Sequence, residues 1–254
     1  DGLGGAIYNE YGTVTIDGDA TFSGNTADYD GGAISNDGTL TITDGATFRS
    51  NTANYYGGAI HNYGIVIINT AQGGLADTGN VLFSGNTDST GSNAIYNYAG
   101  TVNLNAFAGH NVTFEDAISG YYDSDNDEHN FLNINGDGSS ATTDATGNVI
   151  FNKAVANQET INIYQGDVDF NGAITGTKDL NIINGTTSFK DVTVSNAITQ
   201  TAGTSTFDGT VGAKDITING YLINGKESNI NLKELLFFPN YIGYFRNFSF
   251  FMIL

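Results

Sequence analysis

Gly4-Gly5-Ala6-Ile7-Tyr8-Asn9 sets a pattern that returns along the first part of the chain. The same six positions read Gly-Gly-Ala-Ile-Ser-Asn at 31–36 and Gly-Gly-Ala-Ile-His-Asn at 57–62. A diverged copy, Ser-Asn-Ala-Ile-Tyr-Asn, occupies 92–97, so successive copies begin 27, 26 and 35 residues apart. Self-similarity at a period of about 20 to 50 residues indicates a repeat architecture.

The same landmarks follow each copy. A glycine leads into two apolar residues that are separated by one position, and a phenylalanine comes next. The apolar pairs are Val14/Ile16, Leu40/Ile42, Val66/Ile68 and Val102/Leu104, and the phenylalanines are Phe22, Phe48, Phe83 and Phe114. Short alternating runs rich in Val, Ile, Thr and Phe, bounded by Gly, Asn and Asp, predict short β-strands.

A repeat of this size cannot bury its apolar side chains by itself. Stacking the repeats in register buries isoleucine on isoleucine and phenylalanine on phenylalanine. The sequence therefore predicts an all-β fold, a parallel β-helix (β-solenoid) with about three short strands per coil. Each coil should add about 4.8 Å, the spacing between hydrogen-bonded strands.

The repeat pattern divides the chain into zones. We expect one continuous solenoid over residues 1–230, with GGAI and FxxN coils at 1–104, irregular coils at 105–158 and shorter coils at 159–230. In the last zone Phe170, Phe189 and Phe207 are 19 and 18 residues apart. Insertions at 69–80 and 119–130 fall in turns, where solenoids commonly carry their function.

Residues 231–254 change character and form a strongly apolar tail that includes Leu235-Leu236-Phe237-Phe238 and ends at Phe250-Phe251-Met252-Ile253-Leu254. A cap over the open end of the solenoid is one interpretation, because solenoid ends need covering. A poorly ordered end, a truncation or a reading-frame artefact are others. A membrane span is disfavoured because Pro239, Asn240, Arg246 and Asn247 interrupt the run.

The composition limits the classes of partner. The 254 residues include 34 Gly, 1 Pro and no Cys, which excludes disulfides and thiol chemistry, and the glycines have no collagen period. The formal net charge is −19. A surface of that charge repels nucleic acid and anionic lipid, so we expect no nucleic-acid partner and no membrane contact by the solenoid itself.

The GGAI-x-N and FxxNTA motifs resemble the repeats of polymorphic outer membrane proteins and of similar bacterial autotransporter passengers. Gly31 to Asn36 with Phe48 to Ala53, and Gly4 to Asn9 with Phe22 to Ala27, carry the resemblance. It implies a right-handed parallel β-helix that is exported to the bacterial cell surface, kept at the outer membrane or secreted. It also implies an adhesin-like role and a membrane β-barrel elsewhere in the parent protein, of which this chain would be a fragment.

Several residues are candidates for a site. Asn9, Asn36, Asn62 and Asn97 share one repeat position, where their amides could hydrogen-bond from coil to coil as a structural ladder or could bind sugars. Asp123, Asp125 and Asp127 begin like a calcium loop, since carboxylates at alternating positions suit Ca²⁺. Glu128 and Ile134 stand where an EF-hand needs Gly and Glu, so that motif fails and Ca²⁺ remains the one candidate ligand, with no other cofactor indicated.

The sequence predicts no enzyme and no catalytic residue. It contains neither a G-x-S-x-G elbow nor a phosphate-binding loop, and no histidine has metal-ligand spacing. The main hypothesis is a surface-exposed or secreted passenger that binds a host or cell-surface protein or glycan. The alternative is a polysaccharide-degrading β-helix enzyme, a lyase or hydrolase, which would need acidic residues and a basic residue clustered on one stacked face.

Overall fold

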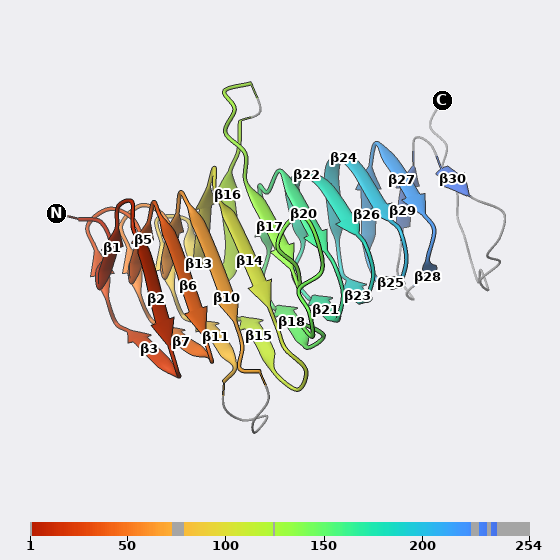
Figure 1. The fold of residues 1–254 in the computed structure, drawn as a ribbon. Coiled ribbons are helices and arrows are strands. Elements are labelled where there is room, and N and C mark those ends of the chain that lie inside the picture. The colour runs from red at the N-terminus through yellow and green to blue at the C-terminus, as the bar shows by residue number, and fades with distance from the viewer. Residues whose placement is uncertain (1, 73–78, 124, 225–228, 233–234, 238–254) are drawn as a thin grey trace.

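The computed structural model describes residues 2–72, 79–123, 125–224, 229–232 and 235–237. The chain winds into an all-β parallel β-helix, as predicted, with its coils stacked from the N-terminal end to the C-terminal end (Figure 1). Within the described residues no helix has the length and hydropathy needed to span a bilayer.

The first coils hold four strands each, because a two-residue strand is added to the three strands that the repeat predicts. They are β1 (Ile7–Asn9), β2 (Thr13–Asp17), β3 (Ala20–Ser23) and β4 (Thr26–Ala27), then β5 (Ile34–Asn36), β6 (Thr39–Thr43), β7 (Ala46–Arg49) and β8 (Thr52–Ala53). The following coils comprise β9 (Ile60–Asn62), β10 (Ile65–Asn69), β11 (Val81–Ser84), β12 (Thr87–Asp88), β13 (Gly91–Tyr98), β14 (Thr101–Asn105), β15 (Asn111–Phe114) and β16 (Ala117–Tyr121).

The later coils are shorter, and two of their strands run through a corner to reach nine residues. They comprise β17 (Phe131–Ile134), β18 (Asn148–Phe151), β19 (Val155–Ala156), β20 (Thr160–Ile163), β21 (Asp167–Phe170), β22 (Ile174–Ile182), β23 (Thr186–Phe189), β24 (Val192–Gln200), β25 (Thr204–Phe207), β26 (Thr210–Ala213), β27 (Asp215–Ile218) and β28 (Tyr221–Asn224).

Strand pairing matches equivalent positions of successive repeats. Ile34 pairs with Ile60 between β5 and β9, and Leu40 pairs with Val66 between β6 and β10. The nine strands β3, β7, β11, β15, β18, β21, β23, β25 and β28 form one sheet of the solenoid, and all their pairings are parallel. One sequence repeat is therefore one turn of the solenoid.

The core consists of stacks of like side chains. The phenylalanine stack joins Phe22, Phe48, Phe83, Phe114, Phe151, Phe170, Phe189 and Phe207, with ring centroids 4.6 to 5.4 Å apart. Isoleucine, leucine and valine stack in the same way on the other sheet and are almost all fully buried. Burial of these stacks is what holds the coils together, since each coil contacts mainly its neighbours.

The paired glycines of the motif are required by the backbone. Gly31 has a φ of +67°, and a Cβ there would lie 2.2 Å from the carbonyl oxygen of Ile34. At Gly32 a Cβ would lie 2.1 Å from the carbonyl oxygen of Gly58 in the next coil. The first glycine therefore makes the turn, and the second lets adjacent coils approach.

Parallel pairing continues past residue 230, where the sequence pattern placed the end of the solenoid. β29 (Asn229–Leu232) pairs with β26, and β30 (Leu235–Phe237) pairs with β27, so the beginning of the apolar tail adds strands to the sheet. The remainder of the tail, 238–254, lies outside the described residues. The interpretation of the tail as a cap over the solenoid end therefore stays a prediction.

Candidate functional site

The amides of the GGAI motif form a ladder inside the solenoid. The Nδ2 of Asn9 donates to the Oδ1 of Asn36 at 2.7 Å, Asn36 donates to Asn62 at 2.9 Å, and Asn62 donates to Asn97 at 2.9 Å. Asn97 then donates to the Oε1 of Gln158 at 3.2 Å. All five side chains are buried, so these amides serve the fold and cannot contact a sugar.

A second ladder follows the FxxN motif. Asn25 donates to Asn51 at 2.8 Å, Asn51 donates to Asn86 at 2.9 Å, and Asn86 donates to the carboxylate of Asp116 at 2.8 Å. Sequence analysis did not predict this ladder, although its signal is visible in the recurrent asparagine three positions after each phenylalanine. Asp116, which is only two positions after Phe114, accepts in place of a further asparagine and so ends the ladder with a carboxylate.

A third ladder differs from the others because it approaches the surface. Asn133 donates to Asn103, Asn162 donates to Asn133 and Asn181 donates to Asn162, each at 2.9 Å. The first two of these asparagines are buried, whereas Asn162 and Asn181 are partly exposed. The ladder therefore brings ordered amides to the outside of the later coils.

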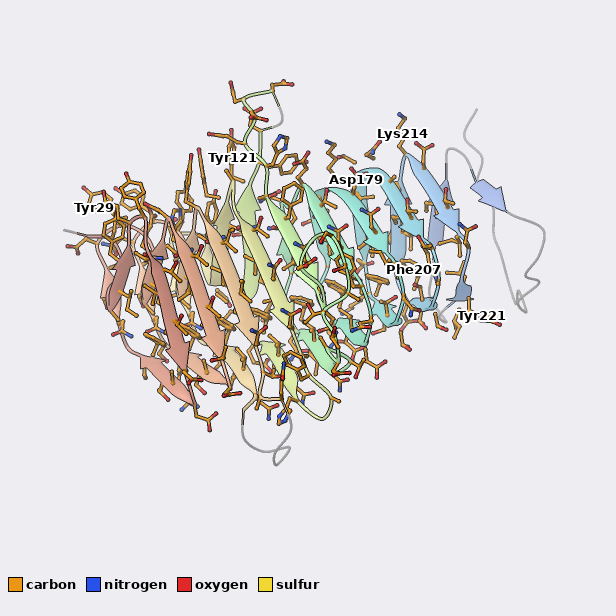
Figure 2. All side chains as sticks on the ribbon, viewed as in Figure 1. Tyr29, Tyr121, Asp179, Phe207, Lys214 and Tyr221 are labelled. Carbon is orange, nitrogen blue, oxygen red and sulfur yellow. The ribbon has the colours of Figure 1, made fainter. Side chains whose placement is uncertain are left out.

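Tyrosines gather on the outside of the earlier coils. We call the side chains of Tyr56, His61, Tyr63, Tyr96, Tyr98 and Tyr121 the tyrosine face. Their rings form a connected set of contacts, from the Tyr56–Tyr96 pair at 4.3 Å through His61 to the Tyr63–Tyr98–Tyr121 stack at 5.1 and 5.2 Å. Tyr29, which stacks on Tyr55 at 5.5 Å, projects from the same side of the solenoid as Tyr121 (Figure 2).

Acidic residues border the tyrosine face. The Tyr98 hydroxyl lies 3.4 Å from Glu128, and the Tyr121 hydroxyl lies 3.5 Å from Asp123. Burial, and then the nearby carboxylates, raise the pKa of both phenols. Burial and the neighbouring tyrosines raise the pKa of Tyr96 to about 12. At neutral pH the face therefore presents neutral phenols beside negative charge.

The stacking of the rings limits what the tyrosine face can bind. Tyr98 lies between Tyr63 of the preceding coil and Tyr121 of the following coil, so both faces of its ring are covered. A sugar ring that stacks on an aromatic residue needs an open ring face. What remains accessible of Tyr98 is ring edge and hydroxyl, the kind of surface that protein interfaces use.

The candidate calcium residues do not gather. Asp123 accepts hydrogen bonds within its own turn from the backbone N–H of Asp125 at 3.0 Å and from Asn126 at 2.7 Å, while Asp125 and Asp127 are exposed. Among the residues that the structure describes, no three His, Asp or Glu side chains form a group that could hold a metal ion. The turn is organised by its own hydrogen bonds, and the structure gives the calcium candidate no support.

A charged cluster joins the 119–130 insertion to the solenoid. The Nδ1 of His129 lies 2.6 Å from one oxygen of Glu159, and the Nζ of Lys178 lies 2.9 Å from the other. His129 also contacts Asp127 through its Nε2 at 3.1 Å. Glu159 and Lys178 occupy equivalent positions one coil apart, but sequence analysis missed the cluster because His129 comes from the insertion, where no repeat landmark identifies it. The cluster combines acidic and basic residues, as the enzyme alternative requires. However, His129 and Lys178 already occupy both carboxylate oxygens of Glu159.

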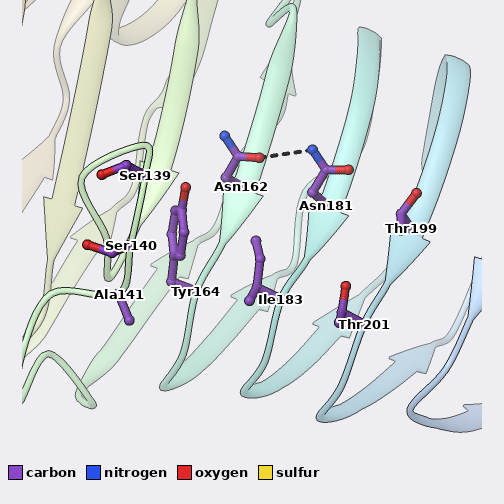
Figure 3. Close-up of a pocket in the computed structure, with 9 residues that line it drawn as sticks. All are labelled: Ser139, Ser140, Ala141, Asn162, Tyr164, Asn181, Ile183, Thr199 and Thr201. Atoms are coloured by element: carbon purple, nitrogen blue, oxygen red, sulfur yellow. Dashed lines mark hydrogen bonds between the residues drawn. The ribbon is translucent and has the colours of Figure 1, made fainter.

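A pocket of about 410 Å³ opens on the later coils (Figure 3). Two parallel rows of side chains form its floor, one being Asn162, Asn181 and Thr199 and the other Tyr164, Ile183 and Thr201. Ser139, Ser140 and Ala141 contribute from the loop between β17 and β18. No residue that lines the described pocket is charged. Sequence analysis did not predict it.

Residues 73–78 of the insertion at 69–80 lie outside the described part of the chain.

Comparison with known proteins gives one match. The Chlamydia polymorphic membrane protein repeat matches residues 19–37 and 45–63. No curated protein and no solved structure matches the chain. Each matched segment contains one phenylalanine of the core stack, one asparagine of the second ladder and one GGAI motif. The resemblance predicted from the GGAI and FxxN motifs is therefore confirmed, as a similarity to the polymorphic membrane protein repeat of Chlamydia.

Proposed function

We propose that this chain is part of a surface-exposed, adhesin-like passenger that binds a protein partner through the tyrosine face. The observation that carries the proposal is the connected set of exposed and half-exposed aromatic rings on the earlier coils. Tyrosine and other aromatic side chains are enriched at interfaces and among the residues that dominate binding energy. The repeat match supports a location at the outer membrane or cell surface.

The charge of the face favours one kind of partner. Asp123 and Glu128 lie within hydrogen-bond reach of the tyrosine hydroxyls, and the whole chain has a formal net charge of −19. A complementary partner surface would carry lysine and arginine, whose positive charge steers association toward the acidic residues that border the face. The covered ring faces of Tyr98, at the centre of the stack, argue for a protein rather than a glycan at this surface.

The test is binding of the labelled full chain to cultured animal cells. Replacing two exposed members of the face in the variant Tyr63→Ser/Tyr121→Ser should lower binding at least tenfold. The matched control, Tyr221→Ser/Ile223→Ser, removes two side chains from β28 that are even more exposed, and it should bind like the parent.

Enzymatic treatment of the cells and a change of salt concentration identify the class of partner. Binding should disappear after protease treatment of the cells, survive glycosidase treatment and weaken at high salt. Equal binding by both double variants would exclude the tyrosine face as the adhesive surface. Loss of binding only after glycosidase treatment would exclude a protein partner.

The alternative, a polysaccharide-degrading enzyme, has one observation in its favour, the cluster of His129, Glu159 and Lys178. A general acid or base needs a carboxylate that can reach the substrate, whereas both oxygens of Glu159 are paired and its side chain is buried. Release of reducing ends from polyuronates or neutral polysaccharides, abolished in Glu159→Gln, would establish the alternative. We expect no release.

A further inference from the structure

The pocket on the later coils has a chemistry that the tyrosine face lacks. Its lining combines amides, hydroxyls, one phenol and one isoleucine, and it contains no charged side chain in a protein of formal net charge −19. Its volume of about 410 Å³ falls in the range of small-molecule sites. An uncharged, polar lining offers nothing to a cation or an anion, and it suits a ligand that carries many hydroxyl groups.

Several polar groups of the pocket are held in place but keep hydrogen-bonding capacity for a ligand. Asn181 donates its Nδ2 to Asn162 at 2.9 Å, while its Oδ1 accepts no hydrogen bond from the described residues. The hydroxyls of Thr199 and Thr201 also lack a hydrogen-bond partner in the described part of the chain. These groups supply one fixed acceptor and two hydroxyls that can each donate or accept.

Tyr164 adds a buried phenol to this set. Its side chain is only 8% exposed, and its hydroxyl makes no hydrogen bond to another described residue. Gly136 lies against the ring, since a Cβ at Gly136 would come within 2.1 Å of it. The ring is therefore held in place while its polar end stays available at the pocket.

Hydrogen bonds also hold the loop that forms the wall of the pocket. In the loop, Asp137 accepts hydrogen bonds from the backbone N–H groups of Ser139 and Ser140 at 2.9 and 2.8 Å. The Nε2 of Gln165 donates to the carbonyl oxygen of Thr142 at 2.7 Å and ties the loop to the solenoid. The pocket is therefore preformed, which reduces the entropy that a ligand must lose on binding.

The floor of the pocket repeats along the axis of the solenoid. Asn162, Asn181 and Thr199 occupy the same position on β20, β22 and β24, so they are spaced by one coil, about 4.8 Å. That step is close to the length of one sugar residue in an extended chain. Three rungs thus present a polar side chain at the same position to successive units of a linear polymer.

We propose that this pocket binds a neutral, linear oligosaccharide that lies along the axis over two or three coils, with Asn181, Thr199 and Tyr164 as its main hydrogen-bonding residues. The site lies on different coils from the tyrosine face and takes a different class of ligand. It therefore goes beyond the proposed function and does not depend on it.

The test measures binding of the full chain to neutral gluco-, manno- and chito-oligosaccharides by calorimetry and by NMR titration. The variant Asn181→Ala/Thr199→Ala should lower the affinity at least tenfold. Asn171→Ala is the matched control, because Asn171 also donates its Nδ2 to the preceding coil, to Asn152 at 2.9 Å, but on an exposed surface away from the pocket. It should bind like the parent.

A second variant separates binding from folding. Ala141→Trp fills the pocket from an exposed loop position without removing a core side chain, and it should also abolish binding. Retained affinity in Ala141→Trp, stronger binding of a charged polysaccharide, or no binding of any neutral oligosaccharide by the parent would each overturn the proposal. The variant Tyr63→Ser/Tyr121→Ser should bind oligosaccharides like the parent. The test of the pocket is therefore independent of the cell-binding test of the tyrosine face.

Discussion

The side-chain amide of Asn86 donates to the carboxylate of Asp116 at 2.8 Å, so a ladder of neutral amides ends in a buried negative charge. Asp116 also accepts the backbone N–H groups of Gly85 and Asn86, each at 2.9 Å, and the hydroxyl of Ser92 at 3.0 Å. Four donors thus converge on one carboxylate, which compensates for its removal from water.

Asp116→Ala should be strongly destabilising, because it leaves four donors without their acceptor. We expect the free energy of unfolding to fall by about 2–4 kcal/mol, measured by urea denaturation. The control is Asp137→Ala, which also removes an acceptor of several hydrogen bonds but from an exposed loop. Similar losses in the two variants would show that burial of Asp116 is not the source of its contribution.

The phenylalanine stack should tolerate truncation at its end better than in its interior. Phe83 is fully buried between Phe48 and Phe114, and Phe83→Ala should cost about 3–5 kcal/mol. Phe22 is only partly buried at the first rung, and Phe22→Ala should cost about 1–2 kcal/mol. Urea midpoints of the two variants give the comparison, and an equal loss would contradict it.

The charged cluster predicts a pH window for attachment of the 119–130 insertion. Hydrogen bonds to Glu159 and then to Asp127 raise the pKa of His129 above 6.5, so its contribution is complete below pH 6.5 and is lost as the pH rises through the raised pKa. Burial opposes ionisation of Glu159, but its bonds to Lys178 and His129 outweigh burial and lower its pKa below 4.5. Its contribution is complete above pH 4.5 and is lost as the pH falls through the lowered pKa.

Amide hydrogen exchange of residues 125–130 should therefore be slowest, after correction for intrinsic rates, between about pH 4.5 and 6.5. In His129→Gln the alkaline increase in corrected exchange should vanish while the acidic one remains. A variant that kept the alkaline increase would assign it to a group other than His129.

Tyr96 should ionise well above the ordinary range for tyrosine. Burial, followed by the nearby Tyr56 and Tyr98, raises its pKa to about 12. NMR titration of carbon-labelled tyrosine, with the signal assigned by Tyr96→Phe, measures this value directly. Tyr56→Phe should lower the pKa of Tyr96 without restoring 10, because burial is the larger cause. Titration of Tyr96 near 10 in the parent would contradict the packing described.

The sequence is sufficient to predict the stacked core, because a parallel solenoid places equivalent repeat positions on top of one another. Phe48 pairs with Phe83 and Leu40 with Val66 as the spacing requires. The positions of Asn9, Asn36, Asn62 and Asn97 follow from the same argument. Gln158 could not be assigned to their ladder, since it lies in an irregular coil where no repeat landmark identifies it.

The surfaces were harder to predict where they depend on contacts between unequal repeat positions. Tyr56 and Tyr96 stack although they occupy different repeat positions, since the repeat pairs Tyr96 with His61. The oligosaccharide pocket requires the loop at 136–146 to fold beside strands that follow it in the chain.

The constant spacing of the coils also sets the distance between the two surfaces. The tyrosine face ends at β16, and the pocket begins beyond β17, so the number of coils between them fixes their separation in units of about 4.8 Å. Because each coil repeats the same interfaces above and below, a whole coil can be gained or lost by duplication or deletion without disturbing its neighbours. Selection could thereby adjust the reach between two binding surfaces while leaving the chemistry of both unchanged.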